Sequence, residues 1–191
     1  MKTVEFYFDY ASPWSYLATE LIQRRLGGVE IVYRPIYLRG LESFKNGVPY
    51  VGAKLAYIAR DLIRCAAHEQ IQLEPPAAFP LDGLHALRAA IVALDRGCFE
   101  AFHKPMFRAA WVERREITKE LAVEKLAAAL EGAPEADVLA AMTGAKERLR
   151  ELTDEAVKRG VFGVPAFVVG DELFWGHDRM DYVAREAAAA S

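Results

Sequence analysis

Segments that favour β-strands lie only near the two ends of this chain, with a long helix-forming part between them. Residues 4–8 and 29–33 are rich in β-formers, and a helical segment that begins at Pro13 separates them. Two strands joined through a helix form a parallel pair by default. Residues 166–169 and 172–175 predict two more strands, because the Gly-Asp dipeptide between them is typical of a hairpin turn. A sheet that holds all four strands must therefore be assembled from both ends of the chain.

Residues 41–149 lack this strand pattern and are rich in Ala, Leu, Glu, Lys and Arg. Apolar residues recur there at spacings of three and four, which predicts helices. The helices expected in and after this part lie at residues 54–69, 83–95, 99–111, 118–130, 134–159 and 178–189. The predicted order is therefore βαβ, a helical insertion, and then α, ββ and α.

Composition excludes several classes of protein. The chain has 24 Lys and Arg against 27 Asp and Glu, a formal net charge of −3, and nucleic-acid binding needs a basic face. No apolar run reaches the ~18 residues of a membrane span, and residues 1–5 do not resemble a signal peptide. Cys65 and Cys98 lack partners at metal-ligand or redox spacing. We therefore expect a cytoplasmic protein with no metal, no nucleic-acid partner and no membrane partner.

Three local features could carry chemistry. Ser12 stands at a helix N-cap with Pro13 at the first helical position, and such a helix start favours a bound anion. Residues 163–165 read Gly-Val-Pro before the hairpin, and His177 and Asp178 stand at the start of the last helix. Each feature alone has an ordinary structural explanation, as a cap, a rigid turn or a charge beside the helix dipole. Their order, however, is the layout of a thioredoxin-like domain, in which all three converge on one pocket.

In that layout, residues 12–15 stand where redox members carry Cys-x-x-Cys, but this chain reads Ser-Pro-Trp-Ser and cannot perform dithiol exchange there. With the motifs at residues 6–17, 163–167 and 174–180, the chain resembles the 2-hydroxychromene-2-carboxylate isomerases and kappa-class glutathione transferases. Further matching segments lie in the insertion, at residues 54–62, 79–80, 88 and 107–111. The resemblance implies an α/β fold of DsbA-like type, with a thioredoxin-like domain at 1–40 and 150–191 interrupted by an all-α insertion domain at 41–149.

The resemblance also implies glutathione as the cofactor, with Ser12 receiving its sulfur. Val164 and Pro165 would pair with the peptide backbone of glutathione, as an added strand pairs with a sheet edge. The other residues implied for glutathione binding are Pro13, Trp14, Asn46, Lys54, His177 and Asp178. Asn46 stands closer to Lys54 than in the family's pattern, and His177 could equally cap the last helix.

The chemistry implied is an isomerisation. Donors at the helix start would stabilise the glutathione thiolate and lower its pKa, and this thiolate would add reversibly to a conjugated aromatic oxo-acid. Ser12 would then donate a hydrogen bond to sulfur and would not act as the nucleophile. Two alternatives stay open: a kappa-class-like transferase that conjugates or reduces electrophiles, and a thioredoxin-fold binding protein without catalysis.

A pocket for the aromatic substrate would come from the helical insertion. The aromatic and basic residues that could form it are Tyr57, Arg60, Arg64 and Trp111. Core packing or a solvated helix face is the commoner explanation for any single one of them. The resemblance to dimeric relatives further implies a homodimer.

Overall fold

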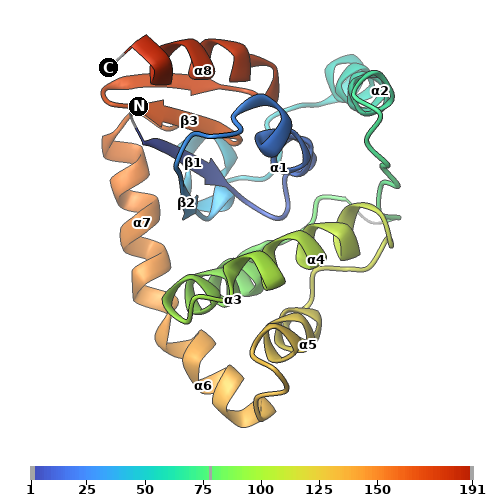
Figure 1. The fold of residues 1–191 in the computed structure, drawn as a ribbon. Coiled ribbons are helices and arrows are strands. Elements are labelled where there is room, and N and C mark those ends of the chain that lie inside the picture. Colours follow the sequence, from blue (N-terminus) through green and yellow to red (C-terminus); the bar gives the residue numbers. More distant parts are fainter. Residues whose placement is uncertain (1–2, 78, 190–191) are drawn as a thin grey trace.

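A computed structural model describes residues 3–77 and 79–189 of the chain. Four strands form one mixed sheet in the order β2-β1-β3-β4 (Figure 1). Strand β1 (Val4–Phe8) runs parallel to β2 (Ile31–Pro35) and antiparallel to β3 (Ala166–Val169), and β4 (Glu172–Trp175) pairs antiparallel with β3. The two ends of the chain therefore meet in one sheet, and the predicted α/β fold class is confirmed.

Helices cover both faces of this sheet and extend below it (Figure 1). In chain order the helices are α1 (Pro13–Arg25), α2 (Gly52–His68), α3 (Leu84–Asp95), α4 (Phe99–Trp111), α5 (Lys119–Ala129), α6 (Glu135–Gly144), α7 (Lys146–Lys158) and α8 (Met180–Ala189), with 3-10 turns η1 (Leu38–Gly40), η2 (Glu42–Phe44) and η3 (His177–Arg179).

Strand β1 supplies the core on both faces because its side chains alternate. Phe6 and Phe8 are fully buried in the cluster that includes residues of α1 and α8, whereas Tyr7 lies in a second cluster with Ala156 of α7. Phe6 is in register with Tyr33 of β2 and stacks on Phe167 of β3, with ring centroids 5.0 Å apart. The loop after β1 therefore leaves a buried strand that is paired with β3 as far as Tyr7 and with β2 as far as Phe8.

Local capping explains where two helices begin. The Ser12 hydroxyl accepts a hydrogen bond from the Ser15 N–H at 3.2 Å, and the Thr118 hydroxyl accepts one from the Leu121 N–H at 3.1 Å. One predicted helix is divided, because residues 134–159 form α6 and α7 with a break at Ala145. Gly144, a weak helix former, precedes the break. The break lets α6 pack on α3 and α5 while α7 continues to β2.

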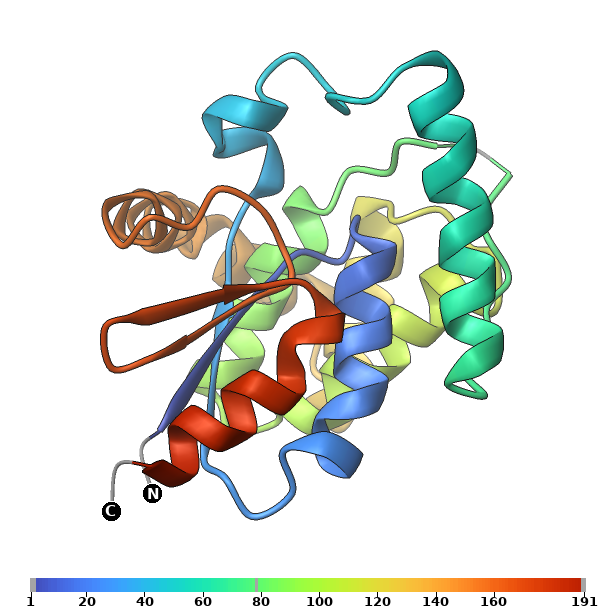
Figure 2. The same cartoon turned by 90° about the horizontal axis from the view of Figure 1, so that it is seen from above.

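Helix α7 joins the sheet to the helices below it. It packs against α3, α6 and β2, and the expected boundary between residues 149 and 150 lies within it. Helix α2, by contrast, stands at the edge of the molecule, away from the sheet (Figures 1 and 2). Across the described ranges, no helix has both the length and the apolar character needed to cross a membrane.

Candidate active site

A cavity of about 920 Å³ lies where the start of α1, the turn before β3, η1, η3 and α2 meet. This volume falls in the usual range for small-molecule sites. The predicted residues that line it are Ser12, Pro13, Trp14, Lys54, Trp111, Val164, Pro165, His177 and Asp178. The fold thus brings together residues from both ends of the chain and from the helical insertion.

Ser12 connects two of these segments, the start of α1 and the turn before β3. Its side chain is buried, with 4% of the residue exposed, and its hydroxyl donates to the Val164 carbonyl at 3.4 Å while accepting from the Ser15 N–H. A donor–acceptor distance of 3.4 Å is long for an O–H···O bond, whose usual range is about 2.5–3.0 Å. The hydroxyl hydrogen is therefore weakly engaged and can be donated to an incoming acceptor at the helix start.

The turn before β3 is fixed against η3. The Val164-Pro165 peptide bond is cis, and the Pro165 carbonyl accepts from the Gly176 N–H at 2.9 Å. Gly176 has a φ of +111°, and a Cβ there would come within 2.5 Å of an Asp178 carboxylate oxygen. Glycine is required here both for the left-handed backbone and for the close approach of Asp178.

His177 and Trp14 form the part of the cavity wall between α1 and η3. Their rings stack with centroids 5.0 Å apart and an interplanar angle of 20°. Burial lowers the pKa of His177, so the imidazole is neutral at pH 7. The 3-10 turn that starts at His177 carries no side-chain cap bond in the part of the chain that the structure describes. His177 therefore contacts the Trp14 ring, and no hydrogen bond from its side chain to the start of η3 is seen among the described residues.

Asp9 lies outside the cavity lining but is bonded to Ala11 and Leu38, which line it, and the sequence analysis missed this supporting role. It is buried, with 1% exposed, and its two carboxylate oxygens accept from the Ala11 N–H at 2.9 Å and the Leu38 N–H at 2.8 Å. Burial raises the pKa of Asp9 to about 6 even though both backbone bonds lower it. Asp9 therefore ties the loop before Ser12 to η1. The available signal was an acidic residue directly after a buried strand.

A second buried network lies behind Ser12. The Tyr10 hydroxyl lies 3.0 Å from His103 Nδ1, the Thr19 hydroxyl lies 3.2 Å from His103 Nε2, and the Trp111 indole N–H donates to the Tyr10 carbonyl at 2.9 Å. Burial lowers the pKa of His103 to about 3, so the ring stays neutral. Trp111 thus lines the cavity and also holds the loop that leads to Ser12.

Four predicted residues do not line the cavity. Asn46 is exposed in the segment between η2 and α2, and Tyr57, Arg60 and Arg64 are exposed on α2. The three α2 residues stand three and four positions apart, so they share one helix face. The opposite, more apolar face of α2 includes Leu55, Ile58 and Leu62, and that face lines the cavity. Tyr57, Arg60 and Arg64 thus lie outside the lining of this cavity, on the other face of the helix.

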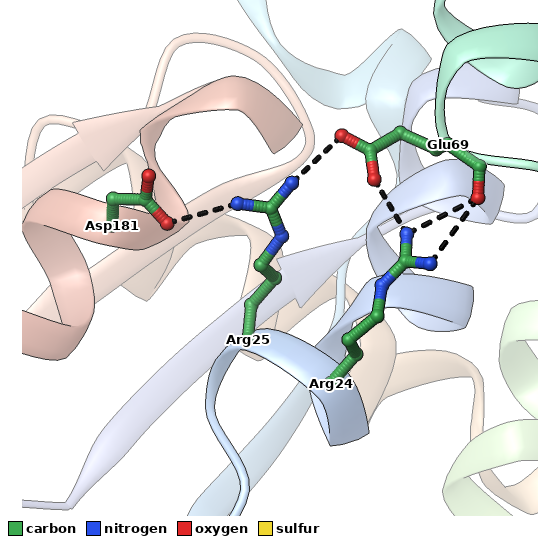
Figure 3. A network of polar contacts seen from close by, with 4 residues as sticks. All are labelled: Arg24, Arg25, Glu69 and Asp181. Carbon is green, nitrogen blue, oxygen red and sulfur yellow. Dashed lines mark hydrogen bonds and ion pairs between the residues drawn. The ribbon is translucent and has the colours of Figure 1, made fainter.

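Helix α2 is held mainly at its C-terminal end, and only Leu62 and Ala66 within it are buried. Figure 3 shows the contacts that hold it. Arg24 binds both the carbonyl and the carboxylate of Glu69, and Arg25 bridges Glu69 at 2.9 Å and Asp181 at 3.1 Å. The N-terminal end of α2 carries Lys54, whose ammonium lies 4.7 Å from the centroid of the Tyr50 ring.

No group of three or more His, Cys, Asp or Glu residues suited to a metal ion occurs among residues 3–77 and 79–189. Cys65 lines the cavity as a free thiol, and burial raises its pKa. The polar groups in the cavity lining therefore include the Ser12 hydroxyl at the helix start, the Cys65 thiol and several charged side chains.

Comparison with known proteins supplies relatives for this arrangement. Residues 3–188 match the family model described as a DSBA-like thioredoxin domain. The chain is 31% identical to a 2-hydroxychromene-2-carboxylate isomerase of Sphingobium xenophagum, over 95% of this chain and 96% of that protein. It is 27% identical to glutathione S-transferase kappa 1 of Homo sapiens, over 96% and 89%. A solved structure of a 2-hydroxychromene-2-carboxylate isomerase matches with a TM-score of 0.74 and 30% identity, over 99% of each chain.

Proposed function

The chain belongs to the DsbA-like thioredoxin family, together with the 2-hydroxychromene-2-carboxylate isomerases and kappa-class glutathione transferases, and on this basis we propose that it is a glutathione-dependent isomerase of a conjugated aromatic oxo-acid. The observation that carries the proposal is Ser12. Its hydroxyl occupies a helix N-terminus inside the cavity, where a redox relative would present its own sulfur. In this proposal the thiol at this position comes from a ligand.

The residues present fit glutathione. The Ser12 hydroxyl is weakly engaged, and the helix start beside it favours a negative charge. Asp178 is exposed in the lining and suits the ammonium of the γ-glutamyl end, while Lys54 suits a carboxylate. The Val164 backbone is available for pairing with a peptide, apart from its long bond to Ser12. Glutathione would supply a thiolate that adds reversibly to the conjugated system and leaves unchanged.

The protein's own groups would control that chemistry. Ser12 would donate its hydrogen to the sulfur, and the N-terminus of α1 would favour the anionic form and lower the thiol pKa. Asp9 would hold the loop that carries Ser12 in position through Ala11 and Leu38. The stacked rings of Trp14 and His177 would reduce access of water to the site. No proton needs to be taken by Ser12 itself.

Glutathione binding tests this function. We expect calorimetry to detect binding of glutathione, and Ser12→Gly to lower glutathione-dependent turnover about tenfold or more, since a donor to a charged group contributes about 1.5–3 kcal/mol. Glycine keeps most of the cap stability of serine, within a few tenths of a kcal/mol, so a loss of activity with little loss of stability assigns the hydroxyl to sulfur.

Ser15→Ala is the matched control, because its hydroxyl is buried three residues away with no hydrogen-bond partner among the described residues. Turnover of this variant should stay near that of the parent protein. No heat with millimolar glutathione, or equal activity losses in the Ser12 and Ser15 variants, would overturn the proposal. Titration of free thiol during turnover separates the isomerase, which conserves glutathione, from the transferase, which consumes it.

A further inference from the structure

Some of the charged side chains that line the cavity have an oppositely charged neighbour close by in the sequence, and others do not. Asp178 is paired with Arg179 at 3.0 Å, and Asp61 lies 4.0 Å from Arg64. Arg39 and Lys54 also line the cavity, but among the described residues neither has an ion pair with a carboxylate that lines it. Within residues 3–77 and 79–189, these two cations thus face the cavity without a counter-ion in its lining. Lys54 stands on α2, whereas Arg39 stands on η1, the turn that Asp9 ties to the Ser12 loop.

Arg39 is oriented from behind the cavity wall. One terminal nitrogen donates to Asp82 at 3.3 Å and the other donates to the Leu81 carbonyl at 3.4 Å. Charge-assisted bonds are normally about 2.7–2.9 Å long, so both contacts are weak. The guanidinium has five N–H donors, and these two contacts leave most of them unused. They hold the side chain in place and leave it able to bind a second anion.

Asp82 has other partners that keep it outside the cavity. Its carboxylate accepts from the Leu84 N–H at 3.0 Å at the start of α3, and from the Tyr37 hydroxyl at 3.3 Å. Asp82 is not part of the cavity lining, whereas Arg39 is. The arginine therefore lines the cavity while its counter-ion does not, although the two neighbours of Asp82, Leu81 and Gly83, also line it.

Aromatic side chains also line the cavity. Phe44, Phe79 and Trp175 line it, and Phe79 and Trp175 remain 50% and 46% exposed. A planar arginine fork suits a carboxylate in two-point contact, and exposed aromatic rings suit an aromatic ligand. We infer that Arg39 is a specificity-determining residue that binds the carboxylate of the aromatic oxo-acid, with its ring against these aromatic side chains. This inference rests on the proposed function and adds the anchor of its substrate.

The test compares Arg39→Gln with a control variant, Arg148→Gln. Arg148 of α7 also forms an ion pair, with Asp95 of α3 at 3.5 Å, but it does not line the cavity. For Arg39→Gln we expect the KM for 2-hydroxychromene-2-carboxylate to rise about tenfold, with kcat changed less than about twofold. The lysine variant, Arg39→Lys, should recover part of the loss, and Arg148→Gln should leave KM unchanged.

Two further measurements separate carboxylate binding from other effects. Binding of trans-cinnamate, measured by calorimetry, should weaken about tenfold in Arg39→Gln, while binding of the neutral cinnamamide and of glutathione should not change. An unchanged KM, equal losses for cinnamate and cinnamamide, or a matching loss of glutathione affinity would overturn the inference. Failure of the parent protein to bind glutathione would overturn the proposed function instead, and the cinnamate comparison would still decide the role of Arg39.

Discussion

Two walls of the cavity differ in how firmly they are held. The α1 wall consists of Ser12, Val164 and Pro165 with Asp9 behind them, and it is buried and hydrogen-bonded to its surroundings. The α2 wall carries Lys54 and Leu55, and it is exposed and held mainly at one end. Asp9 and Ser12 are 1% and 4% exposed, against 38% for Leu55 on α2. Groups that act on a reacting atom need a fixed geometry, and the α1 wall has one. The α2 wall is free to adjust to what the cavity holds, since few tertiary contacts constrain it.

The largest expected effect concerns Asp9 and pH. Burial raises its pKa in the folded protein to about 6 from the ordinary value of 3.8, so the folded state binds the proton more tightly than the unfolded state between these values. Stability therefore falls as pH rises, by about 3 kcal/mol from this group between pH values well below 3.8 and well above 6, of which about 2 kcal/mol is lost from pH 4 to 6. Asp9→Asn cannot titrate and should lose this dependence.

Urea unfolding from pH 4 to 7 measures the difference between the two proteins. The parent protein should lose stability relative to Asp9→Asn as pH rises, and the histidines that titrate in the same range cancel because both proteins contain them. An asparagine side chain has one acceptor oxygen, so either the Ala11 or the Leu38 N–H loses its partner. This adds a loss of stability of about 1–3 kcal/mol that does not depend on pH. Parallel stability profiles would show that Asp9 is not held in the buried state described here.

A smaller effect is expected from a methyl group placed against Asp9. A Cβ at Gly83 would lie 1.9 Å from an Asp9 carboxylate oxygen, whereas a Cβ at Gly144 would have nothing within 4 Å. Gly83→Ala should therefore destabilise the protein by about 2 kcal/mol, as overpacking does, and lower turnover by displacing the Ser12 loop. Gly144→Ala should leave stability unchanged or raise it by up to about 1 kcal/mol. Thermal unfolding that ranks the two variants equally would contradict a close-packed α1 wall.

The α1 wall was the more predictable of the two from sequence. Helix starts at Ser12 and Thr118 and the hairpin turn at Gly170 are local signals, because each depends on a residue and its near neighbours. The contact between Asp9 and Gly83 joins segments far apart in the chain, and no local pattern reports it. The break at Ala145 had only one weak signal, the glycine before it, against a long helical periodicity.

The α2 wall was predicted as a helix, but its orientation was not. Its apolar residues gave the expected spacing, yet periodicity does not say whether an apolar face meets a core or a cavity. Leu55 and Ile58 line the cavity, so the basic face with Arg60 and Arg64 points away from it. Arg39 was missed for a related reason, since a single arginine in a loop acquires meaning only when its neighbours in space are known.

The smallest effect on overall stability is expected from Glu69→Gln, which tests directly whether the α2 wall is held less firmly than the α1 wall. Glu69→Gln removes the charge that Arg24 and Arg25 share at the end of α2. The Glu69 side chain is 15% exposed and its arginine partners are 50% and 36% exposed, so the pairs lie at the surface, where each contributes about 0.2–1 kcal/mol. The free energy of unfolding should therefore fall by about 1 kcal/mol. Locally, however, α2 has few other contacts, and hydrogen exchange of residues 52–68 should accelerate several-fold while exchange in β1 stays constant.

Glu124→Gln is the matched control, because it breaks the pair with Arg115 at 2.7 Å on a different surface. Both variants should lose similar global stability, but only Glu69→Gln should loosen α2 and weaken glutathione binding a few-fold, since Lys54 is carried on the loosened helix. Equal exchange rates in α2 for the two variants would mean that the apolar face toward the cavity, and not the clamp at Glu69, keeps the helix in place. In that case the apolar residues of α2 that line the cavity would hold the helix, and α2 would be as fixed as the α1 wall.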